Sequence, residues 1–167
     1  MMDILKNFYF TKKNILNKDN FIFLLFISII FFFDRISKLK ILDDFSDTTY
    51  FVNNYINFDL TWNTGIGFGL LSSSSNFFYN SLTILIALII LVLFYISLLS
   101  IKVEKYILSL IIGGAIGNFY DRITFKSVPD FIDIHYNNFH WFTFNIADIF
   151  ITLGVLSFMI KSIFDKN

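Results

Sequence analysis

The chain has 167 residues, 56% of them hydrophobic and only 16% charged, with no cysteine and a formal net charge of zero. Soluble domains carry roughly 45–50% apolar and about 25% charged residues, so the composition argues against a soluble domain. The absence of cysteine excludes a disulfide scaffold, thiolate metal sites and a cysteine nucleophile. Zero net charge and scattered lysines argue against a nucleic-acid partner.

Four segments are apolar enough to suggest membrane spans, each of which needs about 20 mostly apolar residues. We expect these spans at roughly 20–40, 77–99, 105–123 and 145–163. The expected fold class is an all-α membrane protein with four transmembrane helices. It forms a single integral membrane domain over 1–167, with the lipid bilayer as its surroundings.

The segment between the first two expected spans, 41–75, has its own composition. Its stretch Thr48–Trp62 is rich in Thr, Tyr, Phe, Val and Ile around a central Asn-Asn, which is typical of a strand pair. We therefore expect a small β-rich extracytoplasmic segment here. A flexible turn is expected at Ser72–Ser75.

Lysine placement predicts the orientation, because cytoplasmic loops carry an excess of Lys and Arg. Lysines precede the first span, lie between the second and third, and follow the fourth, whereas 41–75 contains four Asp and neither Lys nor Arg. Four spans place these three lysine-bearing regions on one side of the membrane. We expect both termini in the cytoplasm, and a retained N-terminal segment because its apolar run lacks a small-residue cleavage site.

Three aspartates interrupt the expected spans at a similar depth. Asp34 and Asp121 each lie 16 residues, about 24 Å of helix, after a cytoplasmic lysine, and Asp148 lies 13 residues, about 20 Å, before one. A charged side chain at such a depth costs roughly 2.5 kcal/mol or more unless it is paired or wet, which marks it as a functional candidate. Three at one depth predict a polar pocket between helices that opens outward.

Polar partners accompany these acids at helical spacing. Residues three or four apart share a helix face, and the pairs so placed are Asn118 with Asp121, Asn145 with Asp148, and Asp34 with Lys38. The expected loop before the fourth span carries a further acid, Asp130. Pro129 stiffens the backbone just before it.

Five blocks of the sequence, in order and with similar spacing, resemble the lipoprotein signal peptidases, which are integral membrane aspartyl proteases of bacteria. The blocks are DRISK at 34–38, NTGIGF at 63–68, GGAIGNFYDR at 113–122, VPDF at 128–131 and FNIAD at 144–148. The third block is long and specific. The chain departs from the family at Gly67, where alanine is usual, and at Pro129, where valine or threonine is usual. Both positions tolerate backbone change, so we expect activity to be retained.

The resemblance implies an endopeptidase that cuts prolipoproteins just before a cysteine carrying diacylglycerol. It places the catalytic pair at Asp130 and Asp148. One carboxylate would act as general base on a water, and the other, protonated, would polarise the scissile carbonyl. Two acids that share a proton titrate as a pair, so neither residue receives a fixed role.

The resemblance also implies surroundings and supporting residues. Four residues match positions that hold substrate backbone or the catalytic acids: Asn63, Asn118, Arg122 and Asn145. The remaining polar positions fall on Asp34, Lys38 and Asp121, and Gly65 matches a loop position that needs backbone freedom. We expect no metal or other cofactor, a monomer in the bacterial cytoplasmic (inner) membrane, and an active site near the outer face.

Some of these residues have simpler interpretations. Asp34 with Lys38 also fits a helix-end ion pair, and Asp121 fits a structural role in positioning its neighbours. Asp133 rivals Asp130 as the second acid.

Two other motifs are expected to play no part in catalysis. His135 and His140 lie five residues apart with no acid at the metalloprotease spacing, so we expect neither to bind a metal. Gly113 and Gly117 form a GxxxG pattern, which indicates close helix packing within the chain.

Intramembrane Asp, Asn and Lys also mark ion paths, so a small transporter or ion-conducting subunit is the alternative function. The polar residues cluster at one depth instead of continuing across the membrane, which favours the enzyme. A presenilin-like protease would need a GxGD block, whereas Gly65-Ile66-Gly67 is followed by Phe68.

Overall fold

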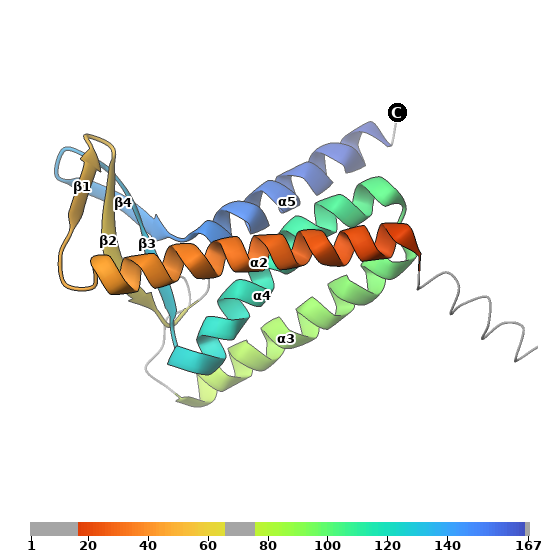
Figure 1. Cartoon of the computed structure of the whole chain (residues 1–167), viewed down its shortest axis with the longest axis horizontal. Helices are drawn as coiled ribbons and strands as arrows, with labels where there is room; N and C mark the ends of the chain where they lie inside the picture. Colours follow the sequence, from red (N-terminus) through yellow and green to blue (C-terminus); the bar gives the residue numbers. More distant parts are fainter. Residues whose placement is uncertain (1–16, 66–75, 166–167) are drawn as a thin grey trace, which may run out of the picture.

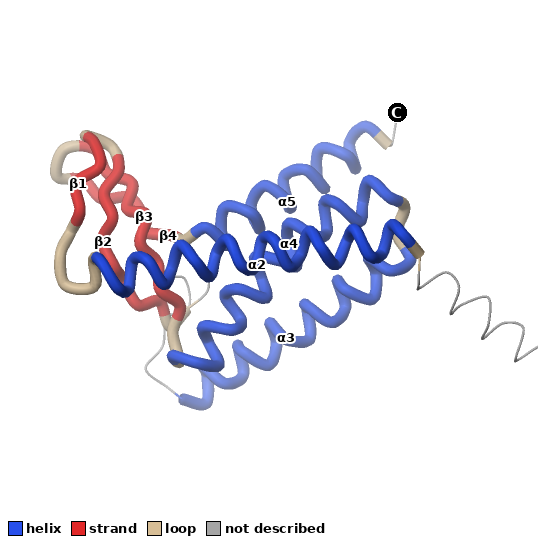
Figure 2. Tube along the Cα trace, viewed as in Figure 1, coloured by secondary structure: helices blue, strands red, loops and turns tan. Residues whose placement is uncertain are grey.

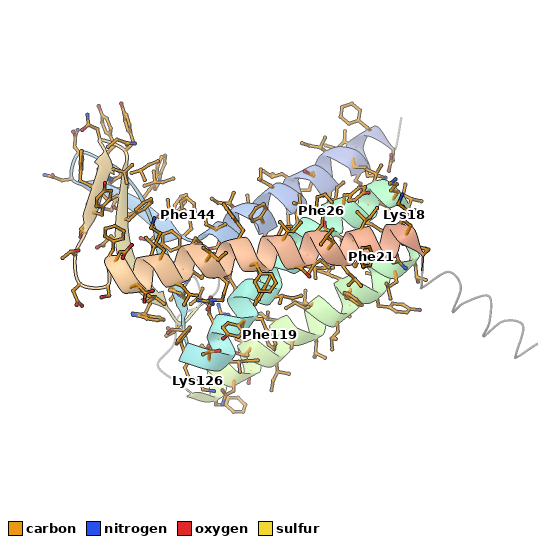
Figure 3. All side chains as sticks on the ribbon, in the orientation of Figure 1. Lys18, Phe21, Phe26, Phe119, Lys126 and Phe144 are labelled. Carbon is orange, nitrogen blue, oxygen red and sulfur yellow. The ribbon has the colours of Figure 1, made fainter. Side chains whose placement is uncertain are left out.

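The computed structural model describes residues 17–65 and 76–165. Its elements, in chain order, are α2 (Lys18–Asp44), β1 (Tyr50–Asn53), β2 (Ile56–Asn63), α3 (Asn76–Leu99), α4 (Lys102–Phe125), β3 (Val128–Tyr136), β4 (Phe139–Phe144) and α5 (Ile146–Phe164). The helices form a bundle and the strands form a sheet at one end of it (Figures 1 and 2). Lys18 and Lys126 lie near opposite ends of this bundle (Figure 3).

Helix α4 is the centre of the bundle, since it packs against α2, α3 and α5. Glycines permit the close approach that this packing needs. A Cβ on Gly113 would lie 2.8 Å from Ile30 Cβ, and a Cβ on Gly117 would lie 2.5 Å from Asp34 Oδ2. The close packing predicted for the GxxxG pattern is therefore confirmed, with α2 as the partner helix.

The bundle has an apolar core in its half away from the sheet, formed by Phe23, Ile27, Leu108 and Ile112. The outward faces of the helices are also apolar, as expected of a protein surrounded by lipid. Phe77 is 83% exposed and Phe21 is 70% exposed, for example.

Two helices are long and apolar enough to cross a membrane by length and composition, Phe77–Leu99 and Ile146–Phe164. Helices α2 and α4 occupy the positions expected for the other two spans, but each carries several buried charged residues. The structure thus confirms a mostly helical protein with membrane character, and the count of four spans stays a prediction.

The sheet is antiparallel, with strand order β1-β2-β3-β4. Strands β1 and β2 confirm the strand pair predicted within 48–62. The expected loop before the fourth span is wrong, however, because residues 128–136 and 139–144 form β3 and β4. Asp130 therefore lies on a strand, not on a loop. The predicted turn at Ser72–Ser75 and the departure at Gly67 lie outside the described residues.

Candidate active site

Asp148 is held in the first turn of α5 by a capping box, which satisfies backbone N–H groups that a helix start leaves free. The backbone N–H of Asp148 donates to Asn145 Oδ1 at 3.1 Å, and the backbone N–H of Asn145 donates to Asp148 Oδ2 at 3.2 Å. The two residues thereby fix each other at the junction of β4 and α5.

Asp130 lies on β3 and is only 2% exposed. Its carboxylate accepts a hydrogen bond from each of two side-chain amides, Asn63 Nδ2 at 2.8 Å and Asn145 Nδ2 at 2.5 Å. Asn145 therefore contacts both Asp130 and Asp148. One asparagine side chain brings together the two acids that the sequence places 18 positions apart.

The environment of Asp130 favours its protonated form. Burial is the largest cause and the negative charge of Asp148 is the second, and together they raise the pKa of Asp130 from 3.8 to about 7. The hydrogen bonds from Asn63 and Asn145 oppose this shift, because they stabilise the carboxylate. At neutral pH both the protonated and the ionised form of Asp130 are therefore populated, which suits an acid or a base in catalysis.

Asn118 connects Asp148 to a buried cation. Its Nδ2 donates to Asp148 Oδ1 at 2.9 Å, and its Oδ1 accepts from Lys38 Nζ at 2.9 Å. Lys38 also donates to Asp34 Oδ2 and to Asp121 Oδ2, each at 2.8 Å. The three protons of the ammonium group thus have three acceptors, as a fully buried lysine requires.

The ion pair of Asp34 and Lys38 lies within α2, which continues to Asp44, so the interpretation as a helix-end pair is wrong. Asp34 Oδ1 accepts from the backbone N–H of Ala147 at 2.9 Å, in the first turn of α5. Gly117 leaves the space that Asp34 Oδ2 occupies. The pair therefore joins α2 to both α4 and α5, close to Asp148 in the first turn of α5.

Arg122 holds the chain just after β2. Its Nη2 donates to the backbone oxygen of Gly65, whose own N–H donates to Asn63 Oδ1 at 2.8 Å. Within the described ranges, Arg122 Nε and Nη1 are buried and have no hydrogen-bond partner.

The structure brings all ten residues expected to be catalytic or supporting into this one hydrogen-bonded network. Sequence reasoning missed two further members. Arg35 forms an ion pair with Asp121, and Tyr79 Oη donates to the backbone oxygen of Arg122 at 2.9 Å. Helical spacing offered a signal for Arg35, because it shares a face with Lys38 three positions on. Tyr79 offered none within its own segment.

Asp133, the rival second acid, points away from this network. It lies three positions from Asp130 on β3, and an odd number of positions along a strand places two side chains on opposite faces. Its Oδ2 lies 2.7 Å from His140 Nδ1.

An apolar pocket opens beside Asp148, between β3, β4 and α5. Its volume is about 290 Å³, and its walls include Phe142, Phe144, Ile149 and Leu153. Figure 3 shows Phe144 where the sheet meets α5. A buried carboxylate at the edge of an apolar pocket can act on a polar bond of a molecule whose apolar part fills that pocket.

Long apolar helices with a buried cluster of ionisable residues at one end are the features of a membrane protein with a buried polar site. Comparison with known proteins gives the family. The sequence profile of signal peptidase (SPase) II matches residues 26–164, and the chain belongs to this family.

Known relatives agree with this assignment. The chain is 45% identical over 166 residues to a lipoprotein signal peptidase of Pelagibacter ubique (strain HTCC1062), covering 98% of this chain and 93% of the relative. It is 42% identical over 131 residues to a lipoprotein signal peptidase of Anaplasma phagocytophilum (strain HZ), covering 75% and 81%.

The fold is also similar to solved structures. A bacterial membrane enzyme solved at 2.3 Å resolution superposes with a TM-score of 0.72 at 28% identity, covering 87% of this chain and 89% of the other. A second, solved at 1.9 Å, gives a TM-score of 0.67 at 28% identity, covering 83% and 90%.

Proposed function

We propose that this chain removes signal peptides from prolipoproteins by aspartyl catalysis, with Asp130 and Asp148 as the catalytic pair. The observation that carries the proposal is that Asn145 donates to both carboxylates, from its side-chain amide to Asp130 and from its backbone N–H to Asp148, beside a pocket that can hold an apolar group. Family membership supports the reaction class, and the raised pKa of Asp130 supports its part in proton transfer.

The proposed reaction needs one proton on the pair at the start. The ionised carboxylate takes a proton from water as the water oxygen attacks the carbonyl carbon of the scissile peptide. The protonated carboxyl group donates its proton to the carbonyl oxygen. The C–N bond then breaks, and the nitrogen leaves with a proton returned by the pair. Arg122 Nε and Nη1, which have no hydrogen-bond partner among the described residues, are suited to hold a neighbouring backbone carbonyl of the substrate.

The substrate proposed is a prolipoprotein whose cysteine already carries diacylglycerol. The pocket beside Asp148 is almost wholly apolar, which suits an acyl chain or an apolar side chain of the signal peptide. We propose that the polar side chains that hydrogen-bond to Asp130 and Asp148 position these two acids, and that no cofactor takes part.

The proposed placement has α2, α3, α4 and α5 all crossing the bacterial cytoplasmic membrane. Apolar side chains exposed on α2, such as Phe32 (59%) and Ile36 (64%), support its contact with lipid. The sheet and the two acids would then face the outer side and both termini the cytoplasm, in a monomer. An ion path is disfavoured, because Phe23, Ile27, Leu108 and Ile112 form an apolar core between α2 and α4 in the half of the bundle away from the sheet.

A cleavage assay in detergent micelles tests the function. A prolipoprotein with and without its diacylglyceryl group is offered to wild type, Asp130→Asn and Asp148→Asn. We expect cleavage of the lipidated form by wild type alone. Asp59→Asn is the matched control, because Asp59 is an exposed acid of the same sheet that binds Thr49, and this variant should keep full activity.

Two results would contradict the proposal. Full activity in Asp130→Asn would move the second acid elsewhere, with Asp133 the next to test. No cleavage of either substrate by folded wild type would favour the transport alternative.

A further inference from the structure

The two histidines of the chain meet at the end of the β3–β4 hairpin. His135 and His140 are register partners, and their rings stack with centroids 5.4 Å apart. A register shift between Ile134 and His135 creates this pairing, as β-bulges commonly re-aim side chains. Asn137, with a φ of 53°, forms the left-handed position of the turn between them.

Asp133 adds a carboxylate to the histidine pair. Its Oδ2 lies 2.7 Å from His140 Nδ1 and 3.8 Å from His135 Nδ1. One ligand atom from each of the three side chains can be chosen so that all lie within 4.8 Å of one another. Because Asp133 and Asp130 point to opposite faces of β3, this cluster is separate from the catalytic pair.

Two polar atoms at this cluster lack partners in the described part of the chain. His135 is 9% exposed, and its Nδ1 forms no hydrogen bond. The buried Oδ1 of Asn57 also forms no hydrogen bond. Asn57 is the register partner of Asp133, so their side chains share a face of the sheet. A buried polar atom without a partner destabilises the fold, and a ligand bound to it would remove that penalty.

We propose that Asp133, His135 and His140 bind a divalent transition-metal ion, for which Zn²⁺ is the fitting probe. Two imidazole nitrogens and one carboxylate oxygen are a ligand set that Zn²⁺ accepts, whereas Mg²⁺ and Ca²⁺ prefer oxygen alone. Tetrahedral Zn²⁺ needs ligand atoms about 3.3 Å apart. The side chain of His140 is 58% exposed, so it can rotate to close the remaining distance.

Spacing along the sequence gave no reason to expect this site, because no acid stands at a metalloprotease position. The acid is Asp133, which lies two positions before His135 on β3. A bound ion would join β3 to β4 and so brace the strand that carries Asp130. This inference concerns binding and does not rest on the proposed function.

Zinc titration of the full-length protein in detergent tests the site. The protein is prepared without a histidine tag, because such a tag would itself bind zinc. Binding is measured by calorimetry and by the thermal unfolding midpoint with and without ZnCl₂. Wild type should bind one ion per chain and unfold at a higher temperature with zinc. His140→Ala should lower the affinity more than about tenfold, since even outer-shell partners of a metal contribute 10–100-fold.

His140→Ala is the decisive variant, because the exposed ring can be removed without opening the core. His135→Ala should lose binding as well. Asp59→Asn, which removes an acid from the same sheet outside the cluster, should bind zinc as wild type does. Zinc binding no tighter in wild type than in His140→Ala would overturn the proposal.

Discussion

The side-chain nitrogen of Asn145 donates to the carboxylate of Asp130 at 2.5 Å, and its side-chain oxygen caps α5, whose first turn contains Asp148. A helix N-cap and a contact to a strand acid are therefore functions of the same side chain. This arrangement couples the start of α5 to β3.

Asn145→Ala should reduce both stability and turnover. Loss of the N-cap costs about 1 kcal/mol of folding free energy, and loss of the contact to Asp130 should lower kcat at least tenfold because the acid pair is no longer held together. Asn17 caps α2 in the same way, accepting from the backbone N–H of Asn20 at 2.7 Å. Asn17→Ala should lose similar stability with unchanged kcat, and equal kcat in the two variants would refute a positioning role for Asn145.

Lys38→Met should destabilise the protein by about 3–5 kcal/mol, because it leaves Asp34 and Asp121 buried without their shared cation. The loss is measured as a fall in the unfolding midpoint in detergent. Lys102→Met is the control, since Lys102 pairs with Asp19 at 3.7 Å with both side chains largely exposed, and such pairs contribute little. Similar midpoints for the two variants would contradict this account of Lys38.

The raised pKa of Asp130 predicts a loss of stability as pH rises. In the folded protein its pKa is about 7, against 3.8 ordinarily, so folding favours the protonated acid. The stabilising contribution is fully present below about pH 3.8 and is lost as pH rises through about 7. Unfolding midpoints of wild type and Asp130→Asn across this range should therefore differ in slope, and parallel curves would show that Asp130 has an ordinary pKa.

Turnover should fall on the alkaline side for the same reason. If the pair needs one proton to start the reaction, kcat decreases as Asp130 loses its proton above about pH 7. The measurement is kcat against pH with the lipidated substrate. A flat profile from pH 6 to 9 would rule out a proton on Asp130 as the required one.

Gly117→Ala should lower kcat in addition to stability. The new methyl would lie 2.5 Å from Asp34 Oδ2 and would displace the carboxylate that holds the backbone N–H of Ala147. Gly113→Ala is the matched control, because its methyl would clash with Ile30 at 2.8 Å and not with a polar side chain. Both should unfold at lower temperature, and only Gly117→Ala should lose activity per folded molecule.

Thr152→Trp should raise KM for the lipidated substrate by filling the pocket beside Asp148. Leu156→Trp, one turn further along α5 at a 49% exposed position outside the pocket lining, should leave KM near the wild-type value. Steady-state kinetics with the two variants make the comparison. Unchanged KM in Thr152→Trp would mean that the substrate does not use this pocket.

The sequence by itself determined the helices, the first strand pair and the aspartates that the structure brings into one network. Long apolar runs and lysine placement depend on local composition, because a helix in lipid satisfies its own backbone hydrogen bonds. The depth of Asp34, Asp121 and Asp148 followed from helical rise alone. In the structure the carboxylates of these three residues belong to one hydrogen-bonded network, which agrees with a common depth.

Only the tertiary structure decided the rest. Strands β3 and β4 were missed because β3 contains a proline and two acids three positions apart, and its pairing with β2 connects residues about 70 positions apart. Sequence separation hides such contacts, whereas helical contacts repeat every three or four residues. The partners of Asp130, the burial that raises its pKa and the meeting of Asp133 with two histidines all depend on that sheet.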